Sequence, residues 1–315
     1  MFLFNKPAGY ASILCLHFIL SGITASCQSG ALPLEQNLYH RAKVDPQTVF
    51  QHSQISVTHI DTATVLIRIG DFTILTDPVF DKPGNYYHHG FGAISKKTDR
   101  PAVEADAIGK VDLVLLSHEQ HKDNLDITGR QIASKATLIL TTLDGAAELP
   151  NARGLKPWQS HQIQLPDNRV LTITATPARH HPAWIPEFVS GPAIGFVLQL
   201  DNEEYALYIT GDTVYFDGID QVAARFKIGL ALVHVGSAEV FYLTGPAQFT
   251  MDAAGYIQAI ESLNPALAIP IHNNGWSHFD ENNQSLLEKL GLHPQILEKT
   301  LIPRRGVVLK FGPGE

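Results

Sequence analysis

"VDLVLLSHEQHKDNLD", Val111 to Asp126, is the stretch that decides the fold. A run of apolar residues stops at Ser117, and two histidines and three acidic residues follow within nine positions. The apolar run is typical of a strand that is buried on both faces. Polar side chains directly after it indicate a functional site at the rigid end of the strand, because packing of a core requires no polar side chains.

Three later strands of similar character end in the same way. "ITATPAR" leads to His180 and His181, "LYIT" leads to Asp212, and "AIPI" leads to His272. A lone histidine at a strand end is more often a hydrogen-bonded structural residue than a metal ligand. The repeated pattern, however, predicts convergence, because loops at the strand ends of α/β sheets gather around ligands. Histidine nitrogens and carboxylate oxygens without sulfur suit zinc, iron or manganese.

The order of the remaining elements predicts a single α/β domain over residues 54–315, with two groups of strands and helices between and outside them. Strands are expected at 54–60, 64–69, 72–78, 111–117, 136–142, 169–179, 193–200, 204–212, 229–236, 266–273 and 306–311. Helices are expected at 253–263, at 284–290, after Asn124 and around 220–226.

Composition limits the class of partner. The chain has 315 residues, of which 44% are hydrophobic and 17% charged, and its formal net charge is −8. No block of Lys and Arg occurs, so neither nucleic acid nor an anionic membrane surface is expected as a partner. A small molecule or a lipid is the expected substrate.

The N-terminal segment predicts export. Residues 1–26 have one Lys, an apolar stretch and then small residues, which is the layout of a signal peptide. "ITASC" resembles a bacterial lipoprotein signal, with Cys27 as the lipidation site; plain cleavage nearby is the alternative. Residues 27–53 are expected to be a polar tether, and the protein is expected in the periplasm or on the outer membrane. Both cysteines, Cys15 and Cys27, belong to this region, so the domain has no thiolate ligand.

Two other catalytic classes fit poorly. The zinc-peptidase motif needs histidines four residues apart on a helix, whereas His118 and His121 are three apart and follow a strand. No Gly-x-Ser-x-Gly nucleophile elbow occurs in the chain.

At this point the residues resemble the metallo-β-lactamase-fold hydrolases, over most of the chain from about Val57 to Phe311. The branch with ascorbate-6-phosphate lactonase and N-acylphosphatidylethanolamine phospholipase D is the most similar. Its members carry a T-H-x-G-x-A segment, a strand ending in TDP, then S-H-x-H-x-D-H-x-D, a His after PA, a GD aspartate and a final P-x-H. This chain has, in the same order, "THIDTAT", "LTDPVF", "SHEQHKDNLD", "TPARH", "TGD" and "IPIH".

The resemblance implies an αββα sandwich of two mixed β-sheets flanked by helices. It implies that His118, His121 and His180 hold one ion, and that Asp123, His272 and a shared Asp212 hold the other. One or two zinc ions are implied, with manganese or iron as alternatives. A metal-bound hydroxide would attack the substrate, with Asp123 and His272 as catalytic residues.

The chain departs from the family pattern at two positions. An extra residue leaves Gln120 and His121 as alternatives for one ligand, and Asn124 stands where the family has a histidine of the second ion. An amide oxygen is a poorer zinc ligand than an imidazole, so a weak, absent or harder second ion is expected.

Further residues are expected near the site. The residues expected to support ligands or touch substrate are His59, Asp77, Asn124, His181, Trp276 and His278. His234 lies in an apolar strand and is expected in the core. "NYYHHGFG", residues 85–92, is expected to be either a lid or a surface loop.

The sequence thus predicts a metal-dependent hydrolase acting on an ester-like bond, either a phosphodiester or phospholipid, or a lactone. A non-catalytic ligand-binding protein on the same fold, and a mono-metal or iron redox enzyme, are the alternatives.

Overall fold

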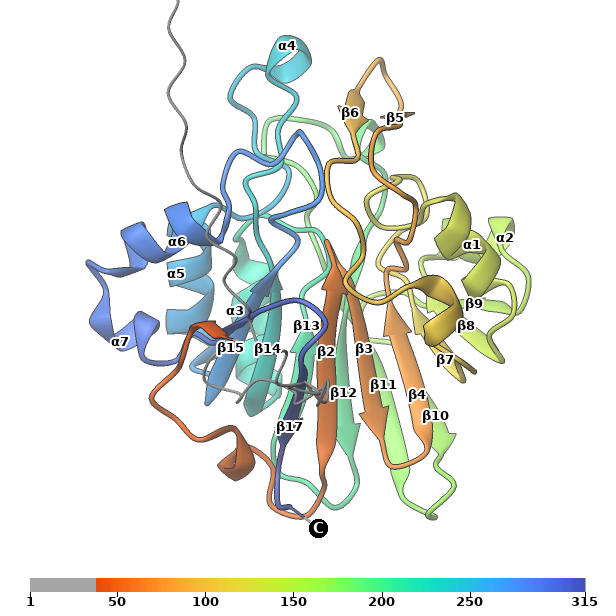
Figure 1. Ribbon diagram of the computed structural model, residues 1–315, viewed down its shortest axis with the longest axis vertical. Coiled ribbons are helices and arrows are strands. Elements are labelled where there is room, and N and C mark those ends of the chain that lie inside the picture. The colour runs from red at the N-terminus through yellow and green to blue at the C-terminus, as the bar shows by residue number, and fades with distance from the viewer. Residues whose placement is uncertain (1–37, 315) are drawn as a thin grey trace, which may run out of the picture. The chain divides into compact units, whose positions relative to one another are not determined.

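The computed structural model describes residues 38–314, which form two mixed β-sheets and two short strand pairs (Figure 1). One sheet has the order β17-β2-β3-β4-β7-β8-β9, and the other has the order β10-β11-β12-β13-β14-β15. The strands of the first sheet are β2 Ile55–Asp61, β3 Thr64–Ile69, β4 Phe72–Thr76, β7 Leu113–Leu115, β8 Leu138–Thr141, β9 Ala152–Gly154 and β17 Val308–Phe311. Those of the second are β10 Ser160–Gln164, β11 Val170–Pro177, β12 Ile194–Leu200, β13 Ala206–Ile209, β14 Ile228–His234 and β15 Leu267–Ile271. The short pairs are β1 Leu38–His40 with β16 Ile302–Pro303, and β5 Tyr86–His88 with β6 Ile94–Lys96.

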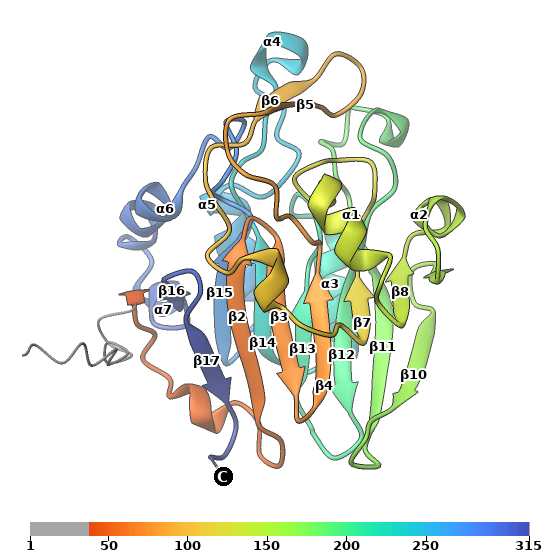
Figure 2. The same cartoon turned by 45° about the vertical axis from the view of Figure 1, so that its right-hand side comes forward.

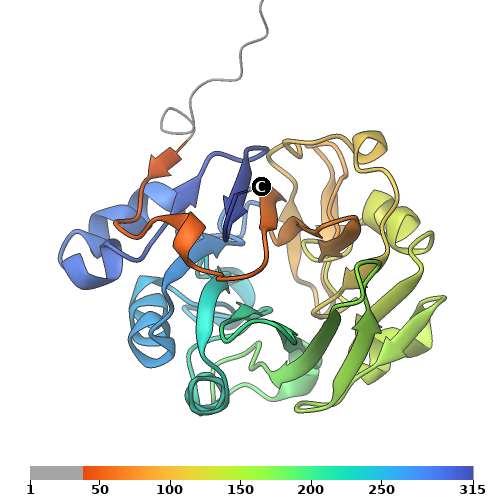
Figure 3. The ribbon, with the colours of Figure 1, turned by 90° about the horizontal axis from the view of Figure 1, so that it is seen from below.

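Helices lie on the outer faces of both sheets, as the view from below shows (Figure 3). The α-helices are α1 Ile127–Ala133, α2 Leu143–Glu148, α3 Asp217–Arg225, α4 Phe241–Thr244, α5 Ala253–Leu263, α6 Asn283–Leu290 and α7 Pro294–Leu297. The 3₁₀ helices are η2 Pro46–Thr48, η3 Ala105–Ala107 and η4 Glu187–Val189. The predicted αββα sandwich of two mixed sheets is confirmed.

Alternation along the strands explains the layers. In β3, Val65 and Ile67 face the apolar cluster shared by the two sheets, whereas Leu66 belongs to the cluster on the side of α1. In β14, Leu232 faces the shared cluster and Val233 faces the helices α3 and α5. Successive side chains of a strand point to opposite faces, so a continuous apolar run supplies both cores at once.

The strand directions bring the predicted site residues to one end of the sandwich. β4, β7, β8 and β9 are parallel neighbours, and so are β13, β14 and β15. β11 runs in the same direction as β13, because β12 between them is antiparallel to both. The loops after these strands, together with β5, β6 and α4, lie at the same end of the sheets (Figure 2).

Some boundaries differ from those expected. The strand expected over 111–117 is only Leu113–Leu115, because the following residues already belong to the site loop. The described part of the predicted tether, residues 38–53, packs on the domain: β1 pairs with β16, and Val49 and Phe50 join the core between the sheets. The predicted signal peptide and Cys27 lie outside the described residues. No helix among residues 38–314 has the length and apolar character needed to cross a membrane.

Two helices begin with the same Asp-x-x-Gly cap but differ in the space behind the glycine. Asp126 accepts from the amide of Gly129 at 2.6 Å, and Asp252 accepts from the amide of Gly255 at 2.8 Å. A methyl group at Gly129 would lie 1.7 Å from the Pro78 carbonyl oxygen, whereas at Gly255 the nearest atoms, 3.3 Å away, belong to the side chain of Met251.

Gly129→Ala is therefore expected to lower the free energy of unfolding by about 3 kcal/mol, the upper end for overpacking, because α1 must move away from the loop after β4. Gly255→Ala is expected to stay within about 1 kcal/mol of the wild type, because helix propensity favours Ala. Urea unfolding of both variants measures the difference. Equal losses would show that α1 is not held against Pro78.

Candidate metal centre

Three histidines meet at the junction of the two sheets. His121 Nδ1 lies 3.1 Å from His118 Nε2 and 3.0 Å from His180 Nε2. His118 and His121 follow β7 in the first sheet, and His180 follows β11 in the second. The structure therefore brings together residues that are about 60 positions apart, and His121 rather than Gln120 joins the group.

Hydrogen bonds on the far side of two of these rings fix which nitrogen faces the centre. His180 Nδ1 donates to the Phe249 carbonyl at 2.8 Å, and His118 Nδ1 lies 3.0 Å from the hydroxyl of Ser117. A neutral imidazole that donates from one nitrogen presents a lone pair on the other. Lone pairs that converge at about 3 Å repel one another unless a cation lies between them.

A second group contains two acids and one histidine. His272 Nε2 lies 3.4 Å from Asp123 Oδ2 and 3.4 Å from Asp212 Oδ1. His272 Nδ1 faces the Val235 carbonyl at 3.3 Å, so its Nε2 is again the free nitrogen. All three side chains are at least 97% buried. The two groups are the triads of potential ligands His118, His121 and His180, and Asp123, Asp212 and His272.

The Asp212 carboxylate lies between the two groups. Its Oδ1 accepts from His234 Nδ1 at 2.8 Å and faces His272. Its Oδ2 has no hydrogen-bond partner and lies 3.7 Å from His180 Nε2 and 3.9 Å from His118 Nε2. One carboxylate thus presents one oxygen to each group, as a bridging ligand must.

A chain of hydrogen bonds holds the loop after β7 in place. Asp77 Oδ1 accepts from the Ser117 amide at 2.7 Å, and the Ser117 hydroxyl faces His118. Asp77 has a φ of 31°, a left-handed conformation that is unfavourable for a side chain larger than glycine. The strained aspartate therefore acts on His118 indirectly, through Ser117.

His59 supports the last histidine in a similar way. The Thr62 carbonyl accepts from His59 Nε2 at 2.9 Å and from the His272 amide at 2.8 Å. His272 itself has a φ of 64°. Strained backbone of this kind persists only where the surroundings hold it, and it is common at functional sites.

Charge at the site matches what metal ions require. Burial lowers the pKa of His118 to about 3 and holds that of His121 well below its usual value, so both rings are neutral. Burial also lowers the pKa of His272, but the carboxylates of Asp212 and Asp123 outweigh this effect and raise it to about 9. Without a cation, a proton on His272 balances the two acids; a bound ion would displace that proton.

Buried polar atoms without partners complete the fit. Asp123 Oδ1, Asp212 Oδ2 and His272 Nε2 are buried and accept or donate no hydrogen bond. Buried polar atoms of this kind are rare and call for an explanation, of which an ion is one. The nitrogen and oxygen donors suit zinc, iron or manganese, with the three-histidine group typical of zinc.

The other predicted residues have different places. Asn124 is fully buried and its Nδ2 lies 3.4 Å from Asp212 Oδ1, so it borders the centre. His278 Nε2 contacts Asp123 Oδ2 at 3.0 Å. His181 bonds locally to the Pro182 carbonyl at 3.0 Å, and no contact connects it to either group. Trp276 is buried beneath the site, where its Nε1 donates to Thr62 Oγ1 at 3.2 Å, so it supports the loop rather than lining the cavity.

Two histidines near the centre were not among the predicted site residues. His234, expected in the core, is indeed fully buried but bonds to Asp212 and stacks on His272, with ring centroids 5.4 Å apart. His234 ends β14, so the strand-end rule applied to the others would have identified it. His89, in the 85–92 segment, lies with its Nδ1 3.6 Å from Asp123 Oδ1. His89 directly follows the short strand β5, but no apolar run precedes it in the sequence as one does before the predicted site residues.

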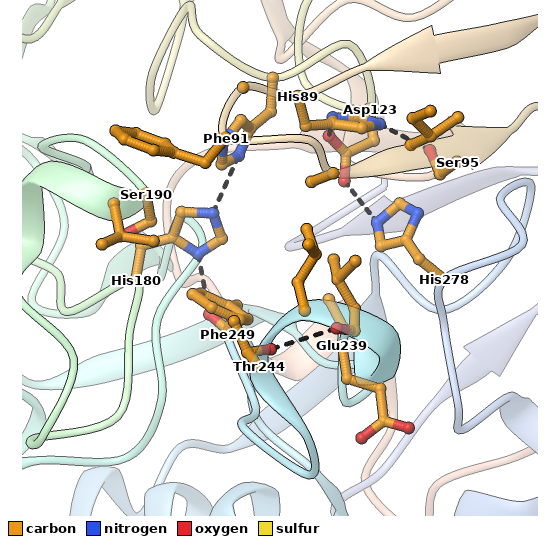
Figure 4. Close-up of a pocket in the computed structure, with 18 residues that line it drawn as sticks. His89, Phe91, Ser95, Asp123, His180, Ser190, Glu239, Thr244, Phe249 and His278 are labelled. Carbon is orange, nitrogen blue, oxygen red and sulfur yellow. Dashed lines mark hydrogen bonds and ion pairs between the residues drawn. The ribbon is translucent and has the colours of Figure 1, made fainter.

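A cavity of about 250 Å³ opens onto the centre (Figure 4). Its base includes His121, Asp123, His180 and His278. Its walls are mainly apolar and come from the β5–β6 hairpin, the end of η4 and the segment around α4: Phe91, Val189, Val240, Leu243 and Phe249. Among the described residues that line it there is no Lys or Arg. Residues 85–92 were predicted to be either a lid or a surface loop, and the position of Phe91 in the cavity wall favours a lid.

The buried His59 makes stability depend on pH. Burial lowers the pKa of His59 to about 4, whereas an unfolded histidine titrates at the ordinary value of 6.5. Between these values the unfolded chain binds the extra proton, so stability falls as pH decreases from 6.5 to 4 and levels off above 6.5. The contribution is at most about 3 kcal/mol.

His59→Gln, which can still donate to Thr62, is expected to flatten the decline in unfolding free energy of the metal-free protein between pH 7 and pH 5. Urea unfolding at both pH values measures the slope. His181→Gln serves as the control and keeps the wild-type slope. An unchanged slope in His59→Gln would show that another group controls acid sensitivity.

Comparison with known proteins shows to which family the chain belongs. A model described as "Beta-lactamase superfamily domain" matches residues 73–273. A UPF0173 metal-dependent hydrolase of Carboxydothermus hydrogenoformans is 30% identical over 52% of this chain and 68% of its own length. A UPF0173 metal-dependent hydrolase of Thermoplasma acidophilum is 24% identical over 59% of this chain and 80% of its own length.

Solved structures share the fold. The crystal structure of an isothiocyanate hydrolase from Delia radicum gut bacteria superposes with a TM-score of 0.68 at 24% identity, over 82% of this chain and 99% of that chain. Together with the matched family model and the two groups of potential ligands, these similarities identify the chain as a metal-dependent hydrolase of the metallo-β-lactamase superfamily.

Proposed function

We propose that this protein hydrolyses small, uncharged molecules that present an electrophilic carbon next to an apolar group. The observation that carries the proposal is the cavity: both ligand groups contribute to its base, its walls are apolar, and no Lys or Arg lines it. The substrate class is therefore inferred from the residues of the cavity walls, and the reaction class from the potential metal ligands at the bottom of the cavity.

The cavity favours a neutral substrate over a phosphodiester. If the substrate carried a charge on a group that does not take part in the reaction, that charge would be buried against apolar walls with no Lys or Arg beside it, which is unfavourable. The one ionisable wall residue besides the histidines and Asp123 is Glu239, an acid that supplies no positive charge to pair an anion. The narrower likeness to the lactonase and phospholipase D branch therefore favours its lactone side.

The residues of the centre have distinct roles in this proposal. His118, His121 and His180 would hold one ion, and Asp123 and His272 would hold the other, with Asp212 shared. Bound cations would lower the pKa of water and polarise the electrophile. Asp123 lies at the cavity base with a free Oδ1, from which it can accept a proton of the attacking water and orient its oxygen toward the substrate.

Esters, lactones and isothiocyanates can all be small, uncharged molecules with an electrophilic carbon next to an apolar group. In each, water oxygen bonds to an electrophilic carbon that carries no formal charge. Isothiocyanates are the first class to test, because a neighbour of the same fold is named for that activity and because they are small, neutral and apolar. That similarity concerns the fold alone, so the activity assays described below decide which of these classes is hydrolysed.

The two alternatives are less well supported. A non-catalytic binding protein would not need buried polar atoms without hydrogen-bond partners, such as Asp123 Oδ1 and His272 Nε2. A mono-metal redox enzyme would leave the Asp123, Asp212 and His272 group without a purpose.

The test compares matched neutral and anionic substrates on zinc- or manganese-loaded protein. Benzyl isothiocyanate is compared with its 4-carboxy derivative, a neutral aryl ester with bis(4-nitrophenyl) phosphate, and a γ-lactone completes the set. At least one neutral substrate is expected to turn over, at a kcat/KM at least about tenfold above its anionic counterpart, since one unpaired charge costs more than about 1.4 kcal/mol.

Asp212→Asn provides the control, because a change at the shared carboxylate should abolish turnover of every substrate. Preferred hydrolysis of the phosphodiester would contradict the proposed substrate class. Metal-loaded protein with no turnover of any of these compounds would contradict the function proposed for this cavity.

A further inference from the structure

The second ligand group holds two carboxylates and only one histidine, and its neighbour Asn124 does not supply the missing imidazole. Asn124 Nδ2 lies 3.3 Å from Ser117 Oγ and 3.4 Å from Asp212 Oδ1. An ionised carboxylate only accepts hydrogen bonds, so the amide must turn its N–H groups toward Asp212. Asn124 therefore turns its amide nitrogen, a donor that cannot bind a cation, toward Asp212, and its Oδ1 is buried without a hydrogen-bond partner.

A different imidazole reaches the same group from a distant part of the chain. His278 Nε2 lies 3.0 Å from Asp123 Oδ2, the same oxygen that His272 Nε2 approaches at 3.4 Å. Figure 4 shows His278 directed at Asp123 from the opposite side of the cavity to His180. Two ring nitrogens thus converge on one carboxylate oxygen.

The two separations at Asp123 Oδ2 are similar to those in the three-histidine group. There, the nitrogens of His118, His121 and His180 are 3.0–3.1 Å apart where they meet. Ligand atoms about 2.0–2.2 Å from one ion lie roughly 3.0–3.5 Å from each other. The 3.0 and 3.4 Å separations around Asp123 Oδ2 fall in that range.

The backbone on both sides of His278 is fixed, which sets the position from which its side chain extends toward Asp123, while its Nδ1 has no hydrogen-bond partner. The Ser277 amide donates to the Lys96 carbonyl at 3.0 Å, and the Glu239 amide donates to the His278 carbonyl at 3.0 Å. His278 is thereby tied to the β5–β6 hairpin on one side and to the segment before α4 on the other. A ligand position with this much support needs little reorganisation to bind an ion.

We propose that His278 is a ligand of the second ion and supplies the imidazole that Asn124 does not. The second site then consists of Asp123, Asp212, His272 and His278, and Asn124 serves to orient Asp212. This inference rests on the metal-binding part of the proposed function and is independent of the substrate.

The first measurement is zinc content and affinity, by elemental analysis after dialysis and by competition with a chromophoric chelator. The wild type is expected to hold two ions per chain. His278→Ala and His278→Gln are expected to retain the first ion and to bind the second more than about 100-fold more weakly, a loss beyond the range for indirect partners. Asn124→Ala is expected to weaken the second ion by about tenfold, the lower end of the range for an indirect partner. His181→Ala is the control and is expected to match the wild type.

The second measurement separates a ligand from an indirect partner. In Co²⁺-loaded protein, each coordinated histidine gives a hyperfine-shifted ring N–H signal in the NMR spectrum, so five signals are expected, from His118, His121, His180, His272 and His278. His278→Gln, fully loaded at high Co²⁺, is expected to lose one. A weaker second ion with all signals retained would overturn the proposal, and so would a wild type that holds one ion.

Unchanged affinity in both His278 variants would also overturn the proposal, whereas failure of all tested substrates with two ions bound would contradict only the proposed function. Circular dichroism of each variant confirms the fold, and the Gln variant preserves a polar side chain of similar length if the Ala variant unfolds.

Discussion

The site depends on the position of one carboxylate, that of Asp212. It is fully buried at the end of β13, with one oxygen toward the three histidines and the other toward His272. Burial opposes its ionisation, but the neighbouring imidazoles, His272 above all, outweigh burial and hold its pKa below the usual range. An isolated buried carboxylate would be strongly unfavourable, so the surrounding imidazoles are what allow Asp212 to remain there, and bound cations would stabilise it further.

Several features of the fold can be traced to this requirement. Gly211 precedes Asp212 with a φ of 65°, and a methyl group there would lie 2.4 Å from the Ile194 carbonyl oxygen. The absence of a side chain at Gly211 therefore lets the chain after β13 approach β12 closely. This close approach allows the Asp212 carboxylate to enter the junction of the sheets. His234 ends the adjacent parallel strand, where its Nδ1 donates to Asp212 and fixes the direction of the carboxylate. The two sheets provide the rigid frame, and the loops at one end provide the ligands.

Much of this arrangement could be predicted from the sequence, because strand ends and polar residues are local signals. The order of the apolar runs predicted one α/β domain with two groups of strands, and the polar residues after those runs predicted a metal site. The αββα sandwich and the division into two ligand groups came from the resemblance to the metallo-β-lactamase-fold hydrolases. The sequence motif left His121 and Gln120 as alternatives. In the structure His121 joins the other histidines, whereas Gln120 lies against Gly191, where a methyl group would be 2.7 Å from its amide nitrogen.

The remainder depends on tertiary contacts that no local pattern records. His89 reaches Asp123 because the β5–β6 hairpin folds over the site, and the hairpin is held there partly by the Ile94 amide, which donates to the Tyr242 hydroxyl at 2.7 Å. The apolar cavity likewise combines three segments that are more than 90 residues apart at their extremes. Its wall residues resemble ordinary surface-loop residues in the sequence, so neither the cavity nor its lack of Lys and Arg could be predicted.

Anomalous X-ray scattering from crystals grown with zinc tests the central claim most directly, namely that Asp212 bridges two ions. Two peaks are expected, on either side of the Asp212 carboxylate and about 3.5–4 Å apart. One peak should lie among His118, His121 and His180, and the other between Asp123 and His272. A single peak at the three histidines, with Asp212 Oδ1 bound only to His234, would contradict the account.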